Sequence, residues 1–325
     1  MTRRSFLARA GAAVALTAIP APLSAQHTKR PRLIGVVSWY ESGTDMLAKD
    51  LEQRFAEMGL LIGRDIIIEY RYAASNPVRA ERDTLEIVAR RPDVIIAQTT
   101  PMAHIVKRIT TTIPIVAHTA DALRTGLVQS LANPGGNLTG VSTTSTELSG
   151  KRVELLRELV PGVVDIAFLG STKDPNGLVF AGETEAAAVK LGIKAKRFMV
   201  DGPEQFAAVF EAMRSGRFGG VVIQPLFVEY RERLARLARE HRLPAGGDQK
   251  SFAEAGLLFS YGTSRRAIHR KIADHAAKIL GGAKPADIPV EQPTEYQFVI
   301  NASTAQALGL TISPSMLAFA NEVIE

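Results

Sequence analysis

The chain has 325 residues, which is more than one average domain, and its 46% of hydrophobic residues can supply the cores of two lobes of about 130 residues each. No run of eighteen or more apolar residues follows the N-terminal segment, so the sequence predicts no membrane span in the mature chain. The formal net charge is +6, but Arg3, Arg4 and Arg9 lie in that segment, and the remaining charge of about +3 does not favour nucleic-acid binding.

The first 25 residues have the features of an export signal. Arg3 and Arg4 precede Phe6-Leu7 and a run of small and apolar residues, a pattern typical of twin-arginine signals. The alternative is a basic amphipathic helix that belongs to the fold. We expect cleavage near Ala25 and a periplasmic location. The chain contains no cysteine, which excludes disulfides and a lipid anchor at an N-terminal cysteine.

Apolar strands and amphipathic helices alternate through the first half of the chain. Short apolar runs predict buried parallel strands, and apolar residues three and four apart predict the helices between them. Such a series implies a parallel sheet with right-handed crossovers. The expected strands cover residues 33–37, 66–70, 94–97 and 113–117, and the expected helices cover 46–58, the region of Leu85 and Val88, and 102–109.

The same series recurs at an offset of about 130 residues, a repeat that indicates two lobes of equal topology. A chance likeness between common βαβ units is the alternative. The strand at residues 166–169 corresponds to the strand at Ile34, residues 190–193 to 58–61, 221–223 to 94–96, and 242–244 to 112–114.

A proline- and glycine-rich segment, residues 134–142, leads out of the first lobe and predicts turns and a hinge. A helix over residues 151–159 then opens the second lobe. A strand over residues 257–260 ends at Tyr261-Gly262, where we expect a second crossing between the lobes.

Apolar residues at helical spacing over 268–279 predict a helix that returns to the first lobe. A proline-rich connector, residues 285–294, forms the third crossing and leads to a strand and helix, residues 298–308, of the second lobe. The fold expected is α/β, with two Rossmann-like (flavodoxin-like) lobes that contain parallel sheets and enclose a ligand cleft. The segments are a signal peptide (1–25), lobe one (32–141 plus 263–292) and lobe two (142–262 plus 293–325). The expected hinge residues are Gly140, Val141, Ser142, Tyr261, Gly262 and Thr294.

Common catalytic motifs are missing from the sequence, including the dinucleotide and P-loop fingerprints, the nucleophile elbow and the zinc-protease motif. His269 and His275 are six residues apart on a helix, whereas a helical metal pair needs three or four. The loop at residues 135–140 precedes a strand rather than a helix N-terminus, so we interpret it as a turn, not a phosphate cradle. We expect no metal, no cofactor and no enzymatic activity.

Polar residues at the strand ends of lobe one favour ligand binding. Thr99 and Thr100 precede a proline at the start of a helix, where backbone N–H groups favour a carboxylate, although Thr100 can also be a simple cap. His118 and Asp121 follow the next strand. Asp121 can bind an ammonium group or cap the following helix.

In lobe two, Asp248 follows two glycines that allow close backbone approach, so it is a candidate for binding a cationic group. Trp39, the single tryptophan, lies at the first strand end. It can stack on a ligand or pack under the adjacent loop. Phe227 and Tyr261 are expected to face it across the cleft.

Several motifs resemble the solute-binding components of bacterial ABC importers with the type I periplasmic-binding fold, in particular the branch that contains tryptophan and tyrosine binders. They are Thr100-Pro101 after a Pro-Asp-Val-Ile strand, residues 134–142, Tyr261-Gly262, residues 278–287, 289–294 and 307–312. The resemblance extends over nearly the whole mature chain. One departure is Asp121-Ala122, where the family often has Asp-Pro.

The resemblance implies a receptor that closes on a small amino-acid-like or carboxylate ligand, with an aromatic amino acid favoured, and delivers it to an inner-membrane permease. It assigns pocket roles to Ser38, Thr99, Thr100 and Asp121, and less directly to Phe227 and Tyr261. We expect a monomer. The alternatives are a ligand-sensing subunit of a signalling system and an exported α/β enzyme.

Overall fold

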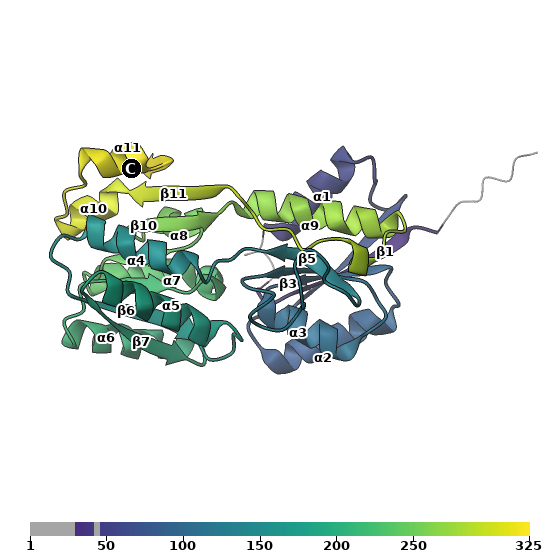
Figure 1. Ribbon diagram of the computed structural model, residues 1–325, viewed down its shortest axis with the longest axis horizontal. Helices are drawn as coiled ribbons and strands as arrows, with labels where there is room; N and C mark the ends of the chain where they lie inside the picture. Colours follow the sequence, from purple (N-terminus) through teal and green to yellow (C-terminus); the bar gives the residue numbers. More distant parts are fainter. Residues whose placement is uncertain (1–29, 42–45) are drawn as a thin grey trace, which may run out of the picture. The chain divides into compact units, whose positions relative to one another are not determined.

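The computed structural model describes residues 30–41 and 46–325, and these contain two β-sheets built from βα series (Figure 1). The expected signal peptide lies outside the described residues. No helix of the described ranges combines the length and apolar character needed to cross a bilayer.

The first sheet has the strand order β2-β1-β3-β4-β5, and every pair in it is parallel. Because parallel strands end at one edge, the register brings their carboxyl ends together: Ser38 lies opposite Gln98, and Gln98 opposite His118. The strands are β1 (Arg32–Ser38), β2 (Ile66–Tyr72), β3 (Val94–Gln98), β4 (Ile115–Thr119) and β5 (Leu138–Ser142).

Two pairs of helices cover the two faces of this sheet. Side chains along β1 point alternately to the two faces of the sheet, so both faces are apolar and each is covered by helices. Ile34 packs in the cluster with α1 and α9, whereas Val37 packs in the cluster with α2 and α3. The helix expected between residues 268 and 279 therefore belongs with the first sheet, although it follows the second lobe in sequence. The helices are α1 (Leu47–Glu57), α2 (Pro77–Ala89), α3 (Thr100–Ile109) and α9 (Arg265–Leu280).

The second sheet has the order β12-β11-β10-β9-β8-β6-β7. Five of its strands, in the order β7-β6-β8-β9-β10, repeat the topology of the first sheet, so the repeat seen in the sequence is confirmed as two equivalent sheets. The strands are β6 (Asp165–Ser171), β7 (Lys194–Val200), β8 (Val221–Ile223), β9 (Ala245–Gly247), β10 (Phe259–Thr263), β11 (Tyr296–Asn301) and β12 (Glu322–Ile324).

Strand β11 runs antiparallel to β10, so the second sheet is predominantly rather than entirely parallel. The reason is the crossings: β10 leads out of lobe two, whereas β11 leads back into it, and the two strands lie side by side. Helices α4 (Leu148–Leu159), α5 (Gly177–Lys190), α10 (Ala302–Leu308) and α11 (Pro314–Phe319) pack on one face of the sheet. The other face carries α6 (Phe206–Ser215), α7 (Arg231–Glu240) and α8 (Lys250–Glu254). The sequence did not predict α11 and β12.

Three short 3₁₀ helices complete the described structure: η1 (Pro203–Gln205), η2 (Pro225–Tyr230) and η3 (Pro285–Asp287). The third crossing follows η3 and bonds to β5, since the amide of Ser142 donates to the carbonyl of Glu291 at 2.9 Å. Thr294 is exposed in this crossing.

Packing explains two of the glycines expected to act as hinges. At Gly140, φ is +141°, and a Cβ atom would lie 2.0 Å from the carbonyl oxygen of Ala117 on the neighbouring strand. At Gly262, a Cβ atom would lie 2.2 Å from the carbonyl oxygen of Asp248. Both positions need glycine for close backbone contact. Hinge motion at Gly140, Val141, Ser142, Tyr261, Gly262 and Thr294 stays a prediction.

Candidate ligand-binding site

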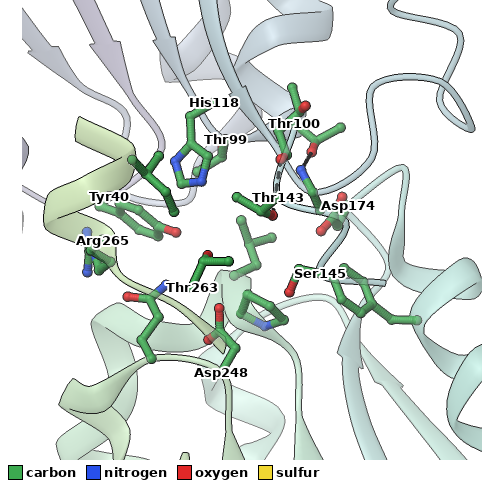
Figure 2. A pocket seen from close by; sticks show the side chains of 17 residues that line it. Tyr40, Thr99, Thr100, His118, Thr143, Ser145, Asp174, Asp248, Thr263 and Arg265 are labelled. Atoms are coloured by element: carbon green, nitrogen blue, oxygen red, sulfur yellow. Dashed lines mark hydrogen bonds between the residues drawn. The ribbon is translucent and has the colours of Figure 1, made fainter. Parts of the chain in front are cut away.

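A cavity lies where the carboxyl ends of the two sheets meet (Figure 2). It contains about 510 Å³ of space not filled by protein atoms, part of it open to solvent. Its position agrees with the rule that open α/β sheets bind ligands outside their strand ends. The lining residues are Tyr40, Thr99, Thr100, His118, Thr119, Ala120, Thr143, Ser145, Asp174, Phe180, Pro225, Leu226, Asp248, Gln249, Thr263, Arg265 and Ile268.

Thr99 and Thr100 join β3 to α3 and differ in their bonding. Thr99 has φ 89° and ψ 155°, a backbone conformation that is essentially restricted to glycine, and its buried Oγ1 has no hydrogen-bond partner among the described residues. The Thr100 hydroxyl accepts hydrogen bonds from the Ala120 amide and from Asn176 Nδ2, both at 3.1 Å. The unused Thr99 hydroxyl is therefore available to a ligand.

His118 ends strand β4 and adds an imidazole to the same wall. Its Nδ1 is buried and has no partner within the described ranges. Burial, helped by the charges of His269 and Arg265, lowers the pKa of His118 to about 3. The ring is therefore neutral near pH 7 and offers one donor and one acceptor.

Asp248 and Gln249 follow β9 and line the opposite wall. Asp248 Oδ1 and Gln249 Oε1 are buried, and neither has a partner in the part of the chain that the structure describes. Burial raises the pKa of Asp248, while the charges of Arg152 and Arg265 act in the other direction. An unsatisfied buried acceptor is costly, so these two oxygens favour a ligand that carries hydrogen-bond donors.

Asp174, which follows β6, is a second acidic group on the lobe-two wall. Its Oδ1 accepts from the Asn176 amide at 2.9 Å and its Oδ2 from Gln224 Nε2 at 2.5 Å. Burial raises the pKa of Asp174 to about 6, although both hydrogen bonds favour the ionised form. This carboxyl group therefore titrates close to neutral pH.

Arg265 and Tyr40 form the side of the cavity opposite Ser145 in Figure 2. Arg265 is the first residue of α9, and its guanidinium lies 5.9 Å from the centre of the Tyr40 ring. Sequence reasoning missed both residues. The signal was present, because Tyr40 follows β1 closely and Arg265 follows β10, and strand ends were the rule that identified the other candidates.

The structure brings four of the nine expected ligand contacts to the cavity wall: Thr99, Thr100, His118 and Asp248. Ser38 lies behind the wall, where its hydroxyl donates to Gln98 Oε1 at 2.6 Å. Asp121 uses Oδ1 to cap the turn at Arg124, accepting from that amide at 3.0 Å, and Thr146 donates to its Oδ2 at 3.3 Å. Ser38 and Asp121 thus make contacts within the protein in this structure, and their expected ligand roles stay predictions.

The three aromatic candidates also lie outside the cavity lining. Trp39 is 2% exposed and belongs to a continuous apolar cluster that also contains Phe227. The Phe227 ring packs edge-to-face on Phe206, with centroids 5.0 Å apart, and Tyr261 stacks on Tyr296 at 6.1 Å. In this structure these rings pack against protein, and their expected ligand contacts stay predictions.

Direct contacts also join the two lobes around the cavity. Arg124 of lobe one forms an ion pair with Glu183 of lobe two at 2.6 Å. Glu229 of lobe two accepts from the amide of Glu41 at 3.1 Å and from the hydroxyl of Ser75. Together with the bond from Asn176 to Thr100, these contacts join the two walls of the cleft. Within the described ranges, no group of three or more acidic, histidine or cysteine side chains is arranged to hold a metal ion.

A family profile described as ABC transporter substrate binding protein matches residues 37–324. The chain belongs to this family. The match includes all the cavity residues and both sheets except the start of β1. The family binds substrates, so the findings indicate binding and not catalysis.

Relatives with known names agree with this assignment. The Tyrosine-binding protein of Clostridioides difficile (strain R20291) is 25% identical over 293 residues, which cover 87% of this chain and 82% of that protein. A solved ABC domain in complex with L-Trp from Streptococcus pneumonia is 26% identical, with a TM-score of 0.84, and covers 90% of this chain and 100% of its own. A conserved domain protein from Vibrio cholerae O1 biovar eltor has the same identity, TM-score and coverage.

Proposed function

We propose that this substrate-binding protein is a periplasmic receptor that closes on a small zwitterion, with an aromatic amino acid favoured, and delivers it to the permease of an ABC importer. One observation carries the choice of ligand: the unsatisfied buried polar atoms differ in chemistry between the lobes. Lobe one offers the Thr99 hydroxyl and the His118 ring, whereas lobe two offers the Asp248 and Gln249 oxygens.

A zwitterion complements these two walls. Its carboxylate accepts from the hydroxyl-rich wall of lobe one, which also contains Thr119, and its ammonium donates to Asp248 and Gln249. A ligand that bonds to both walls stabilises the closed arrangement more than the open one, which is the only requirement for closure.

The apolar residues of the cavity support an aromatic side chain on the ligand. The lining includes two aromatic rings, Tyr40 and Phe180, and the aliphatic side chains of Leu226 and Ile268. The relatives that bind tyrosine or tryptophan by name support the same class. Export through a twin-arginine signal, a location in the periplasm and a monomeric state are parts of the proposal that rest on the sequence.

The first test is calorimetric titration of refolded protein, freed of copurified ligand, with each of the twenty amino acids. We expect saturable binding of at least one of L-tryptophan, L-tyrosine and L-phenylalanine. We expect tryptamine and indole-3-propionate, which each lack one charge, to bind at least about tenfold more weakly than L-tryptophan. The amino-acid proposal fails if none of the twenty gives heat or a thermal shift.

Delivery needs its own test, because binding alone does not demonstrate transport. We expect deletion of the gene to abolish uptake of the radiolabelled ligand at low external concentration, and the intact gene to restore uptake. Unchanged uptake together with an altered transcriptional response to the ligand would instead support a sensory subunit.

A further inference from the structure

Arg152, on α4, is a buried cation that the proposed ligand contacts leave unexplained. The residue is 1% exposed, and its described hydrogen bonds go to two backbone carbonyl oxygens and one hydroxyl, not to a carboxylate. Burial lowers the pKa of Arg152, and the charge of Asp248 partly opposes this effect. Burying an arginine without a paired carboxylate is costly, so its retention calls for a specific role.

The guanidinium joins two of the three crossings between the lobes. Arg152 Nε donates to the carbonyl oxygen of Tyr261 at 2.9 Å, and Tyr261 lies in β10 just before the second crossing. Nη1 and Nη2 donate to the carbonyl oxygen and the Oγ of Ser145 at 3.3 and 3.0 Å. Ser145 lies in the first crossing, between β5 and α4. One rigid planar group therefore fixes the spacing of two chain segments.

Ser145 also lines the ligand cavity. Because its Oγ accepts a hydrogen bond from Arg152, its own proton must point to a different acceptor. No described hydrogen bond uses this proton. A cationic donor behind the hydroxyl also makes it a stronger donor to a negative group in front of it.

We propose that Arg152 is a positioning residue that ties the first and second crossings together and orients the Ser145 hydroxyl as a donor to the carboxylate of the bound ligand. The first part, the link between the two crossings through Arg152 (the tie), does not depend on a ligand. The second part, the orientation of the Ser145 hydroxyl, rests on the proposed function, so the two parts are tested separately.

Hydrogen exchange of the ligand-free protein tests the tie. We expect Arg152→Met to accelerate amide exchange about tenfold in peptides that cover residues 143–147 and 261–264, because both crossings lose their shared anchor. The matched control is Arg157→Met, which removes an exposed arginine from the same helix and should leave both peptides unchanged. If both peptides exchange in Arg152→Met at the same rates as in the wild type, Arg152 does not link the two crossings.

A double-mutant cycle with L-tryptophan as the probe tests the orientation of Ser145. We expect Arg152→Met to weaken binding about tenfold in the wild-type background but less than about threefold in a Ser145→Ala background, because the hydroxyl it orients is then absent. An equal loss in both backgrounds would overturn this part.

Ser145→Ala alone leaves the guanidinium in place, so it tests the donor even if Arg152→Met fails to fold. Unchanged affinity for L-tryptophan in Ser145→Ala would also overturn the orientation. If the wild-type protein binds none of the aromatic amino acids, the proposed ligand and the orientation of Ser145 both fail, and the exchange measurement still decides the tie.

Discussion

Asn176 of lobe two donates a hydrogen bond to Thr100 of lobe one, with 3.1 Å between Nδ2 and Oγ1. Asn176 is fully buried and Thr100 is 3% exposed. Asn176 precedes α5 and Thr100 begins α3, so the bond links the starts of two helices that pack on different sheets. Because the two partners belong to different lobes, we expect opening of the cleft to break this bond.

We expect Asn176→Ala to weaken ligand binding by about twofold to tenfold, the range for one neutral hydrogen bond, because the closed state alone loses an interaction. Calorimetry with the best aromatic amino acid measures the change. Asn133→Ala, which removes an exposed asparagine, is the matched control. Affinity equal to that of the wild type in Asn176→Ala would show that this bond does not contribute to closure.

The raised pKa of Asp174, about 6 against an ordinary value of 3.8, makes the stability depend on pH. Between about pH 4 and pH 6 the folded carboxyl keeps a proton that the unfolded chain has lost, so the free energy of unfolding falls as the pH rises through this window. Across this window the free energy of unfolding falls by about 3 kcal/mol in total.

Urea unfolding of wild type and Asp174→Asn from pH 4 to pH 7 isolates this contribution as the difference between the two proteins. We expect the wild type to lose stability relative to the variant as the pH rises, with no further change well above pH 6. A difference that stays constant across the window would contradict the raised pKa of Asp174.

The buried His118 ring changes the free energy of unfolding with pH in the opposite direction from Asp174. Because its pKa is lowered to about 3, the ring stays unprotonated in the folded protein, whereas in the unfolded chain it is protonated below about pH 6.5. The free energy of unfolding therefore falls as the pH drops below that value. Nuclear magnetic resonance of the histidine rings, with His118→Gln to assign the signals, should show no titration of His118 from pH 8 to pH 5. A midpoint above pH 5 would rule out the buried neutral ring.

Gly140→Ala should destabilise the protein by more than about 3 kcal/mol, because the residue has φ +141° and the added Cβ would overlap the Ala117 carbonyl. Gly182→Ala is the matched control, since this helical glycine has no heavy atom within 4 Å of the added Cβ. We expect the control to gain about 0.5–1 kcal/mol. Thermal unfolding compares the two, and similar melting temperatures would refute the packing argument.

Periodicity was sufficient to predict most of the fold. The buried runs near Ile34 and Ile166 identified β1 and β6, which occupy equivalent places in the two sheets, because an apolar run between two amphipathic helices has few other structures available. The direction of β11 was not predictable in the same way. It depends on which strand lies beside it after the third crossing, and that is a tertiary relationship.

The candidate site was predicted only in part, for a physical reason. Strand ends of a parallel sheet converge, so Thr99 and His118 lie at the ligand-facing edge of the first sheet and Asp248 at that of the second. An aromatic residue at a strand end can instead pack against protein, as Trp39 does, and only the position of neighbouring side chains decides between the two. Arg265, which begins α9 two residues after the end of β10, was missed although it follows a strand end.

The strained backbone conformation of Thr99 affects which residue selection will favour at this position. Glycine would adopt φ 89° and ψ 155° without strain, whereas threonine pays about 1–3 kcal/mol to do so. Laboratory evolution that rewards heat resistance alone should therefore enrich Thr99→Gly and remove a hydroxyl from the cavity. Retention of threonine at this position would instead mark selection for ligand binding, so the identity of residue 99 reports which of the two properties a population of variants has been selected for.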